Sequence, residues 1–571
     1  MDRLLPDAVL SPTTAASRGR NNCCCSVVVD HHDRCLSFAA AALAVQEHRR
    51  HLERQQCSNN DNNERSTTVL VAYLSWNSID FALSVLACMQ CHRYVPALLN
   101  ARWTVDEIVA VLANGPYRDR LCICYMLGDL QATAHSVTEK LYARNIFRTI
   151  QLLELPTYGM ERMEAPRPPP WMAPESWRTP CCSTDTSPPL SRSTAVILFT
   201  SGTTSVPKGV ELSHAALYVQ ARAKQQSLYT SSTTLLGSTV PLFHVGGLTN
   251  WLAVWMAGGN IVLPSTTTTS TTAGGGASFR PDSVWRSVES QATNTLVVVP
   301  TMLFLLQQQQ LRANNNNSKT TTFPGVRLIL MGGQSASPAL LDWTRRVFPA
   351  ARLVQTYACT EAASSITLYD VTKHQKSGSS TFGVVGKPHV PVAILDNNNN
   401  NDTILTAPRK VGTIATRGAH VMNGYWGDTK RVIHANWFRT SDLGCWDEQG
   451  RLVFCGRATD SIRTGGETVM ALEVEQCILQ SGADIRECAV FGIKDDKYGE
   501  LVCCALVPAT TTTPLTIAAV RKICADGGLT PFKHPRKVLN LRQLPRNSSG
   551  KVQKFRLAEA LNDPRSSRSR L

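Results

Sequence analysis

No apolar run in the sequence is long enough to cross a bilayer. The longest nearly apolar stretch, residues 295–306 (TLVVVPTMLFLL), contains Pro300 and is shorter than the ~20 residues that a membrane helix needs. We interpret this stretch as buried core and predict no membrane span. The chain has 571 residues, 43% of them hydrophobic, which is too many for one ordinary core and predicts a large multi-lobed enzyme or several domains.

Signatures of nucleic-acid binding are also lacking. The formal net charge is +15, yet Lys and Arg are scattered, and there is no zinc-finger spacing, basic zipper or aromatic-basic RNA-binding pattern. We therefore predict no nucleic-acid partner. A basic surface equally suits small substrates that carry several negative charges.

The 19 cysteines do not form a disulfide pattern. Cys181 and Cys182 are adjacent, as are Cys503 and Cys504, and adjacent cysteines are poorly placed for a framework of bridges. We predict reduced, buried thiols. Residues 88–91 form a lone Cys-x-x-Cys within an apolar helical stretch, with no second pair at zinc spacing, so we favour core packing over metal binding there.

The two ends of the sequence bear on location. The N-terminal residues lack the apolar core of a secretory signal and mix acidic residues with Arg and Ser, so an organelle transit peptide stays one alternative. Ser569, Arg570 and Leu571 resemble the Ser-Lys-Leu peroxisomal address, although a frayed basic tail explains them equally well. We expect a peroxisome or chloroplast location, with the cytoplasm as a further alternative.

Runs of one or two residue types punctuate the chain. Such tracts bury little apolar area, so we predict surface loops inserted between core elements. They mark where the fold tolerates extra length. The runs lie at residues 59–63, 265–276, 307–310, 314–317, 397–401 and 510–513.

Between these runs, β-branched stretches alternate with amphipathic ones. This alternation predicts strands followed by helices, and so α/β layers with mixed or parallel sheets. Near residue 457 the pattern shifts to a shorter unit, 473–479 then 488–492, which predicts a small second domain. The earlier strand and helix pairs are 69–74 with 78–91, 194–199 with 213–226, and 326–331 with 338–347.

Residues 194–213 (TAVILFTSGTTSVPKGVELS) carry the strongest chemical signal. We expect a buried strand, a loop rich in hydroxyls and glycines, and then a helix. Unpaired backbone N–H groups, hydroxyls and one lysine form a cradle for a polyphosphate, although the spacing of a Walker A loop is absent. The cradle residues are Thr200, Ser201, Gly202, Thr203, Thr204, Lys208 and Gly209.

This segment resembles the phosphate-binding signature of the adenylate-forming superfamily, which includes acyl-CoA and aryl-CoA ligases, peptide-synthetase adenylation domains and beetle luciferases. The resemblance implies an α/β fold with a large N-terminal multi-sheet domain that binds ATP and the acid, and a small, mobile α+β C-terminal domain. The implied boundaries are an N-terminal extension or targeting segment at 1–66, the large domain at 67–456, a hinge at 457–460, the small domain at 461–560 and a tail at 561–571.

Two further superfamily motifs lie in the large domain. Residues 241–247 (PLFHVGG) resemble the motif whose histidine lines the acyl pocket, which implies that role for His244, with a satisfied core histidine as the alternative. Residues 355–361 (QTYACTE) resemble the motif in which Thr360 contacts the α-phosphate and Glu361 holds Mg²⁺. A metal-bound carboxylate suits a triphosphate site, because the bare charges would repel.

The resemblance continues toward the C-terminus. Asp442 stands where the superfamily has the aspartate that accepts hydrogen bonds from both ribose hydroxyls. Arg457 would reach the ribose or a phosphate, and Asp460 would be the hinge residue. Residues 545–551 (PRNSSGK) resemble the loop that delivers the catalytic lysine, Lys551.

Taken residue by residue, the resemblance implies roles in catalysis, cofactor binding and metal binding. The catalytic residues would be Lys551, Thr360, Glu361 and His244, and Mg²⁺ would bind Glu361 and Thr200. The residues that bind ATP or coenzyme A would be Thr200, Ser201, Gly202, Thr203, Thr204, Lys208, Gly333, Tyr357, Asp442, Arg457, Asp460, Arg463, Gly465 and Gly466. Departures from the superfamily pattern, which we expect to alter pocket shape and rate and to leave the reaction class unchanged, lie at Ser205, Ala358, Cys359, Ser441 and Arg463.

The implied reaction has two steps. A carboxylic acid attacks the α-phosphorus of ATP, and the protein supplies positive charge and orientation for that attack. The small domain then rotates about the hinge, withdraws Lys551 and presents residues 464–467, so that the thiol of coenzyme A can attack the mixed anhydride.

Within the superfamily, the sequence most resembles the 2-succinylbenzoate–CoA ligases of menaquinone and phylloquinone synthesis, particularly those of photosynthetic eukaryotes. The hydroxyls of Ser364 and Ser365 suit a keto or carboxylate group of an aromatic diacid, or else they are helix-start hydroxyls. The alternatives are a CoA ligase for a medium-chain fatty or phenylpropanoid acid, an adenylating domain that loads a carrier protein in trans, and a catalytically silent binding protein. The resemblance is carried by residues 324–327, 331–333, 360–367, 416–422 and 463–467.

Overall fold

The computed structural model describes most of the chain from residue 69 to residue 562, with short segments before it. The described residues fall into two compact units: unit 1 takes residues 1–334, 342–374 and 418–432, and unit 2 takes residues 335–341, 375–417 and 433–571. The predicted hinge at 457–460 stays a prediction. The described residues are 26–29, 35–37, 44–47, 49–50, 69–90, 94–116, 120–125, 129–147, 149–155, 192–200, 207–237, 239–263, 279–290, 293–313, 321–333, 336, 338–372, 383–397, 403–428, 433–434, 437–509, 514–546 and 552–562.

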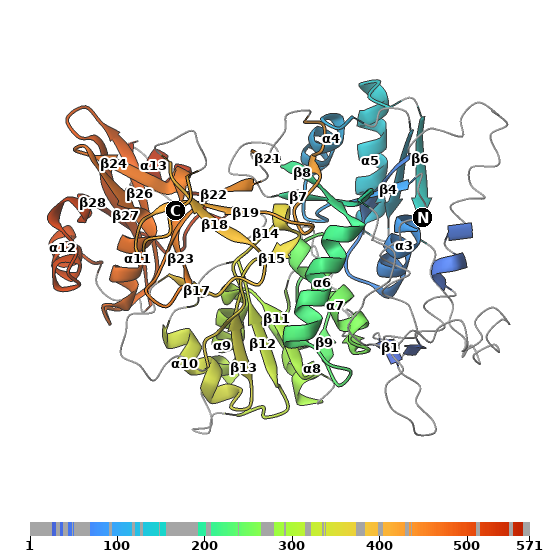
Figure 1. Cartoon of the computed structure of the whole chain (residues 1–571), viewed down its shortest axis with the longest axis horizontal. Helices are drawn as coiled ribbons and strands as arrows, with labels where there is room; N and C mark the ends of the chain where they lie inside the picture. The colour runs from blue at the N-terminus through green and yellow to red at the C-terminus, as the bar shows by residue number, and fades with distance from the viewer. Residues whose placement is uncertain are drawn as a thin grey trace. The chain divides into compact units, whose positions relative to one another are not determined.

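Unit 1 contains a seven-stranded sheet of order β20-β8-β7-β4-β3-β5-β6. Strands β4, β6, β7 and β8 of this sheet are labelled in Figure 1. The strands from β3 to β7 pair in parallel, whereas β8 runs antiparallel to both of its neighbours. Strand β3 is buried along its whole length, as its apolar sequence VLVAYL predicts. The strands are β3 Val69–Leu74, β4 Tyr94–Leu98, β5 Arg120–Tyr125, β6 Thr149–Glu154, β7 Thr194–Thr200, β8 Lys208–Ser213 and β20 Gly424–Tyr425.

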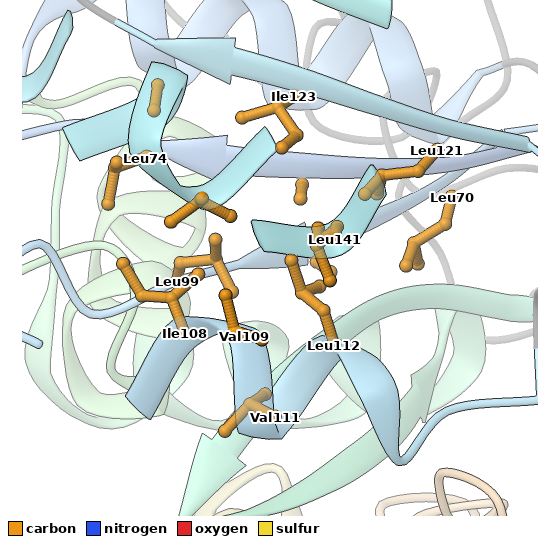
Figure 2. Packing of buried hydrophobic residues seen from close by; sticks show 14 of the residues in the cluster. Leu70, Leu74, Leu99, Ile108, Val109, Val111, Leu112, Leu121, Ile123 and Leu141 are labelled. Carbon is orange, nitrogen blue, oxygen red and sulfur yellow. The ribbon is translucent and has the colours of Figure 1, made fainter. Parts of the chain in front are cut away.

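The helices of this part of unit 1 are α3 (Ile79–Met89), α4 (Val105–Ala113) and α5 (Asp129–Ala143). Helix α4 begins at a capping box, in which the Thr104 hydroxyl accepts from the backbone N–H of Glu107 and the Glu107 carboxylate accepts from that of Thr104. Its apolar face packs against residues of the strands in one buried cluster, drawn in Figure 2. This core fixes the sheet whose edge carries the predicted phosphate loop.

A second sheet of unit 1 has eight strands in the order β16-β13-β12-β11-β9-β10-β1-β2. Strands β9 to β13 pair in parallel within it. The strands are β1 Ser26–Val29, β2 Cys35–Ser37, β9 Thr234–Leu236, β10 Asn260–Val262, β11 Thr295–Val298, β12 Leu328–Met331, β13 Arg352–Gln355 and β16 Tyr369–Asp370. The helices that alternate with them are α6 His214–Leu228, α7 Val245–Met256, α8 Pro281–Glu289, α9 Pro300–Ala313 and α10 Pro338–Val347.

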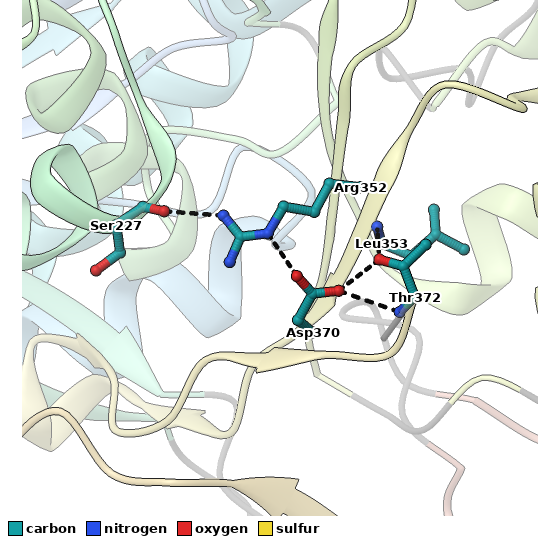
Figure 3. Close-up of polar contacts among 5 residues, drawn as sticks. All are labelled: Ser227, Arg352, Leu353, Asp370 and Thr372. Carbon is teal, nitrogen blue, oxygen red and sulfur yellow. Dashed lines mark hydrogen bonds and ion pairs between the residues drawn. The ribbon is translucent and has the colours of Figure 1, made fainter. Parts of the chain in front are cut away.

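Arg352 links the end of α6 to this sheet (Figure 3). Arg352 on β13 donates to the carboxylate of Asp370 on β16 at 2.7 Å and to the backbone oxygen of Ser227 on α6 at 2.9 Å. Burial alone would raise the pKa of Asp370, but the hydrogen bonds from Thr372 and the ion pair with Arg352 hold the pKa below its ordinary value. The charged carboxylate therefore anchors Arg352, and the guanidinium of Arg352 bonds the end of α6 to the sheet.

Unit 2 contains two smaller sheets. One has the order β17-β23-β22-β19-β18 with β21 paired to β22, and the other has the order β25-β24-β27-β26 with β28 paired to β27. The strands are β17 Val384–Gly386, β18 Val392–Leu395, β19 Gly412–Thr416, β21 Ile433–His434, β22 Trp437–Trp446, β23 Leu452–Arg457, β24 Ser461–Thr464, β25 Glu467–Met470, β26 Ile485–Asp495, β27 Gly499–Pro508 and β28 Lys537–Asn540. The helices are α11 Ala471–Gln480, α12 Ile517–Asp526 and α13 Lys554–Asn562.

The fold class expected from the sequence is confirmed. The chain is a mixed α/β protein with a larger N-terminal part of several sheets and a smaller C-terminal part that combines sheet and helices. Each predicted strand and helix pair appears, with α6 capped at Ser213 as its pattern indicates. The cysteines Cys503 and Cys504 are buried free thiols on β27.

Two expectations were wrong in detail. The run at residues 307–310 forms the last turns of α9 and not a surface loop, because Gln310 bonds the backbone oxygen of Thr321 and accepts from the indole of Trp343. A strand, β8, lies between the phosphate loop and α6, and it begins at Lys208.

The apolar stretch at 295–306 forms β11 and the start of α9, and none of the helices in the described ranges has the length and hydropathy of a bilayer-spanning segment. The other single-residue runs lie outside the described residues, apart from Asn397.

Candidate active site

The two ends of the predicted phosphate loop are held together by β7 and β8. Thr200 ends β7 and Lys208 begins β8, and the two residues are paired in the antiparallel register. The hydroxyl of Thr200 donates to the backbone oxygen of Lys208 at 3.4 Å. Ser201, Gly202, Thr203 and Thr204 lie outside the described residues. The strand pair therefore brings Thr200 and Lys208, the two described ends of the predicted phosphate loop, together.

Tyr425 connects the base of this loop to the predicted metal ligand. Because β20 pairs with β8, the Tyr425 ring lies 5.2 Å from Nζ of Lys208, in a cation–π contact. The hydroxyl of the same tyrosine donates to Oε1 of Glu361 at 2.9 Å. One aromatic ring thus contacts both the cation of the phosphate loop and the carboxylate that the sequence assigns to Mg²⁺.

The hydroxyl of Tyr425 stays protonated at ordinary pH. Burial raises the pKa of Tyr425, and the nearby Glu361 carboxylate raises this pKa further because a phenolate would be repelled by it. A protonated phenol is a hydrogen-bond donor, and so it orients the carboxylate of Glu361. Among the described residues, no hydrogen bond reaches Oε2 of Glu361, which leaves that oxygen for a cation.

The backbone around Glu361 is held on both sides. Thr360, Glu361 and Ala362 form the short 3-10 helix η5 between β14 (Ala358–Cys359) and β15 (Ser364–Ser365). The N–H of Met422 donates to the backbone oxygen of Glu361 at 2.9 Å. Ala363 and Ser364 have positive φ values of 52° and 127°, a conformation that non-glycine residues adopt mostly where the surroundings enforce it.

Gly333 and Tyr357 lie just beyond the carboxyl ends of two parallel strands, β12 and β13. In open α/β sheets, ligands bind outside such strand ends. Gly333 has φ +81°, a left-handed conformation that favours glycine. The N–H of Tyr357 donates to the hydroxyl of Thr367 at 3.3 Å, which fixes the segment that leads to Thr360.

His244 is the residue that precedes helix α7, and its ring is half-buried. The ring of Phe243 lies edge-on to it with centroids 4.9 Å apart. Asn77 fixes this turn, since its side chain donates to the backbone oxygens of Gly237 and Val240 and accepts from the N–H of Leu242. Asn77 precedes α3, so the chain at the start of α3 holds this turn in place. A fixed turn suits the predicted role of His244 as a pocket residue.

Unit 2 brings together two of the predicted nucleotide-binding residues. Asp442 on β22 and Arg457 on β23 are register partners, and Nε of Arg457 lies 3.8 Å from Oδ1 of Asp442. The N–H of Asp442 donates to the Thr440 hydroxyl at 3.1 Å. A carboxylate can accept several hydrogen bonds, so an aspartate at this position suits the two hydroxyls of a ribose.

The predicted hinge and glycine residues also lie in unit 2. Asp460 forms an ion pair with Nζ of Lys554 at 3.6 Å. The backbone N–H of Arg463 on β24 donates to the Glu500 carboxylate at 2.7 Å. Gly465 and Gly466 form the turn between β24 and β25 with φ values of +60° and +85°, so this turn requires glycine.

Lys551 lies outside the described residues, and only the flanks of its loop are seen. Arg546 and Val552 pair as an antiparallel bridge, and the N–H of Gln553 donates to the backbone oxygen of Pro545 at 2.8 Å. These two contacts hold the flanks of the predicted lysine loop next to each other.

The residues at hand fit a magnesium ion. Within the described residues, no cluster of three or more His, Cys, Asp or Glu side chains occurs, but Mg²⁺ in nucleotide sites commonly takes one or two protein oxygens plus substrate phosphates. Glu361, oriented by Tyr425, provides such an oxygen.

Sequence reasoning missed Tyr425 and two polar residues of α6, Gln220 and Lys224. Tyr425 belongs to a short strand that contributes to the site only through its pairing with β8. Gln220 and Lys224 follow the buried Leu217 at helical spacing, and polar residues on the buried face of a helix are a signal that could have identified them.

Comparisons with known proteins identify the family of this chain. The model for the AMP-binding enzyme family matches residues 17–426, and the model for the AMP-binding enzyme C-terminal domain matches residues 473–551. The chain is 29% identical over 538 residues to the chloroplastic/peroxisomal 2-succinylbenzoate–CoA ligase of Arabidopsis thaliana, which covers 85% of this chain and 86% of the relative. It is 31% identical over 390 residues to the oxalate–CoA ligase of Saccharomyces cerevisiae, covering 66% of this chain and 65% of the relative.

Among solved structures, the fold is similar to o-succinylbenzoate CoA synthetase from Bacillus subtilis in complex with its acyl-adenylate intermediate. The TM-score is 0.69 at 21% sequence identity, with 93% of this chain and 95% of that chain covered. Another structure of that bacterial protein contains ATP and a magnesium ion.

Proposed function

The chain belongs to the AMP-binding enzyme family, and from this premise we propose that it is a carboxylate–CoA ligase that forms an acyl-adenylate from ATP and then a CoA thioester. We propose 2-succinylbenzoate as its acid, in menaquinone or phylloquinone synthesis. The observation that carries the proposal is the Tyr425 ring, which contacts both Lys208 of the phosphate loop and the Glu361 carboxylate.

In the first half-reaction, a carboxylate oxygen of the acid attacks the α-phosphorus of ATP, and pyrophosphate leaves. Both reactants are anions, so the site must supply positive charge and orientation. Lys208 and Lys551 provide cations, and Thr200 and Thr360 provide hydroxyls. Glu361 and Thr200 would hold Mg²⁺, which would supply positive charge against the phosphates.

In the second half-reaction, the CoA thiol attacks the acyl carbon, the bond from that carbon to the bridging oxygen breaks, and AMP leaves. We propose that unit 2 contributes differently to the two half-reactions, with Asp442 and Arg457 on the ribose and with Lys551 needed for the first half-reaction. The turn at Gly465 and Gly466 would then line the path of the thiol. Backbone without side chains allows such close approach.

Two observations support 2-succinylbenzoate. The plant relative with that printed activity matches 85% of this chain, and the hydroxyls of Ser364 and Ser365 are buried next to Glu361's short helix. Buried hydroxyls suit an acid that carries oxygen functions beyond the reacting carboxylate, whereas a fatty-acid pocket would be apolar. The same reasoning makes another dicarboxylic acid, such as oxalate, the second candidate, since a relative has that printed activity.

The test is ATP–pyrophosphate exchange across a panel of acids, followed by CoA-dependent AMP release. The panel contains 2-succinylbenzoate, oxalate, malonate, a medium-chain fatty acid and cinnamate. We expect 2-succinylbenzoate to give the highest kcat/KM in both assays. Equal or higher turnover of the fatty acid or cinnamate would contradict the proposed substrate, and exchange without any CoA thioester would point to a carrier protein as the acceptor.

We also propose a peroxisome or chloroplast location, because the Arabidopsis relative carries both locations in its printed name. Imaging a fluorescent fusion with and without Ser569–Leu571 distinguishes a peroxisomal from a chloroplast location. Loss of a punctate pattern on deletion supports peroxisomes. A cytosolic pattern in both fusions would contradict the proposal.

A further inference from the structure

Unit 1 buries a lysine that no motif explains. Lys224 lies on α6 and is 1% exposed. Its Nζ donates to the Thr249 hydroxyl on α7 at 2.8 Å and to the Ser364 hydroxyl on β15 at 3.0 Å. Among the described residues, no carboxylate lies within ion-pair distance of Nζ. The lysine therefore has hydroxyl partners but no counter-charge.

An ammonium group without a counter-charge is unfavourable in a protein interior. Burial lowers the pKa of Lys224 to about 7, and no charged neighbour adds to this effect. A bound anion would remove the penalty, because it would pair with the ammonium where water cannot screen the attraction. A buried lysine of this kind is therefore suited to bind an anionic group of a ligand.

The surroundings of Lys224 contain further polar atoms without partners. Within the described residues, the Ser365 hydroxyl and Oε1 of Gln220 are buried and make no hydrogen bond. Nε2 of Gln220 meanwhile donates to the backbone oxygens of Ala362 and Ser365, at 2.9 and 2.8 Å, and so holds the turn after Glu361. Buried polar groups in native proteins are nearly all bonded, so a cluster of unbonded ones marks a place where a ligand completes the set.

Three elements meet at Lys224, and two of them directly follow residues that the sequence assigns to the site. Helix α7 follows His244, and β15 follows Glu361. Helices α6 and α7 lie side by side, and α7 contacts β15 (Figure 1). The ammonium group is thus bonded to the two elements that follow, within a few residues, the predicted pocket histidine and the predicted metal-binding carboxylate.

We propose that Lys224 is the acid-specificity residue: its ammonium group pairs with the second, non-reacting carboxylate of a dicarboxylic substrate, and the Ser365 hydroxyl donates to that group. This inference rests on the proposed function and adds to it the way in which the acid is selected. It assigns Lys224 a positioning role, since the reacting carboxylate is the other one.

The test compares a diacid with matched mono-acids in Lys224→Met, which keeps the length of the side chain and removes the charge. 2-Succinylbenzoate is assayed beside 4-oxo-4-phenylbutanoate, which lacks the ring carboxylate, and 2-butanoylbenzoate, which lacks the chain carboxylate. Oxalate and malonate are assayed beside acetate. We expect the substitution to lower kcat/KM for the preferred diacid about 100-fold, because its second carboxylate is left buried and unpaired. Turnover of the better mono-acid should change less than about threefold.

Thr249→Val is the matched control, because it removes a hydrogen bond of Lys224 and keeps the charge. It should retain the preference for the diacid. Circular dichroism and thermal melting of all variants show whether each one is folded. A Lys224→Met variant that fails to fold is replaced by Lys224→Gln, with the same expected loss of preference.

The outcomes separate the two proposals. If wild type prefers a different diacid and Lys224→Met abolishes that preference, the proposed substrate is wrong and the inference stands. If wild type prefers 2-succinylbenzoate and Lys224→Met lowers the turnover of diacid and mono-acid equally, Lys224 only ties helices together and the inference is wrong. If wild type prefers mono-acids, both are wrong.

Discussion

The hydroxyl of Tyr425, on the strand β20 that pairs with β8, donates a 2.9 Å hydrogen bond to Oε1 of Glu361. Tyr425→Phe removes this donor and keeps the ring that contacts Lys208. A hydrogen bond to a charged group contributes about 1.5–3 kcal/mol, so we expect the Mg²⁺ concentration for half-maximal ATP–pyrophosphate exchange to rise about 10-fold. Tyr218→Phe, which loses only a contact with Arg222 on the surface of α6, is the control. Unchanged magnesium dependence in Tyr425→Phe would show that the bond does not orient Glu361.

Gly115 leaves space for the residue next to Tyr425. A Cβ at Gly115 would lie 1.9 Å from Cζ2 of Trp426, which packs edge-on against Phe199 of β7. Gly115→Ala therefore forces the indole to move, and overpacking of this kind costs about 1–3 kcal/mol. Chemical denaturation should show this loss, together with lower exchange activity because Tyr425 moves with its neighbour. Gly325→Ala, where a Cβ meets nothing within 4 Å, should match wild type in both measurements.

Lys224 predicts a pH dependence of stability. Its pKa is lowered to about 7 in the folded chain from an ordinary value of 10.5, so between these values the unfolded chain binds more protons than the folded chain. The contribution of Lys224 to the free energy of unfolding therefore rises with pH from about 7 to about 10.5. In urea unfolding without ligand, wild type should gain stability relative to Lys224→Met between pH 7 and pH 9, by at most about 1.4 kcal/mol per pH unit. A difference that stays constant over this range would contradict the burial of an unpaired ammonium group.

Lys551→Ala should separate the two half-reactions. If Lys551 bridges the α-phosphate and the attacking carboxylate, its loss lowers the rate of adenylation by a factor of about 10²–10³. Thioester formation from chemically made acyl-adenylate and CoA should stay within a few-fold of wild type, since the proposed mechanism withdraws the lysine in that step. An equal, large loss in both half-reactions would mean that Lys551 supports the fold and not the chemistry.

The sequence predicts the elements of this fold well where one face is plainly apolar. The run at 69–74 forms β3 with the predicted bounds, and Ser213 caps α6, because burial and capping are decided by neighbours close in the chain. The glutamine run at 307–310 was misjudged because its helical state depends on Trp343 and Thr321, which are distant in sequence. Composition alone cannot reveal such partners.

The residues of the candidate site can likewise be predicted from the sequence only in part. Motif resemblance locates Thr200, Glu361 and Asp442, since each lies within a short recognisable segment. Tyr425 and Lys224 are functional candidates only through tertiary contacts: the first reaches Glu361 by strand pairing, and the second reaches Ser364 by helix packing. Long-range contacts of this kind leave little trace in a local sequence pattern. For Lys224, the trace is a charged residue at a position on the buried face of α6.

The acyl-adenylate is the central claim, and an oxygen label tests it most directly. The preferred acid is prepared with ¹⁸O in its reacting carboxylate and incubated with the enzyme, ATP, Mg²⁺ and CoA, and the products are analysed by mass spectrometry. Attack of a carboxylate oxygen on the α-phosphorus, followed by cleavage of the acyl carbon–oxygen bond by the thiol, leaves one ¹⁸O in each AMP. We predict AMP with one labelled oxygen and unlabelled pyrophosphate. Unlabelled AMP, or label in inorganic phosphate with formation of ADP, would contradict the account.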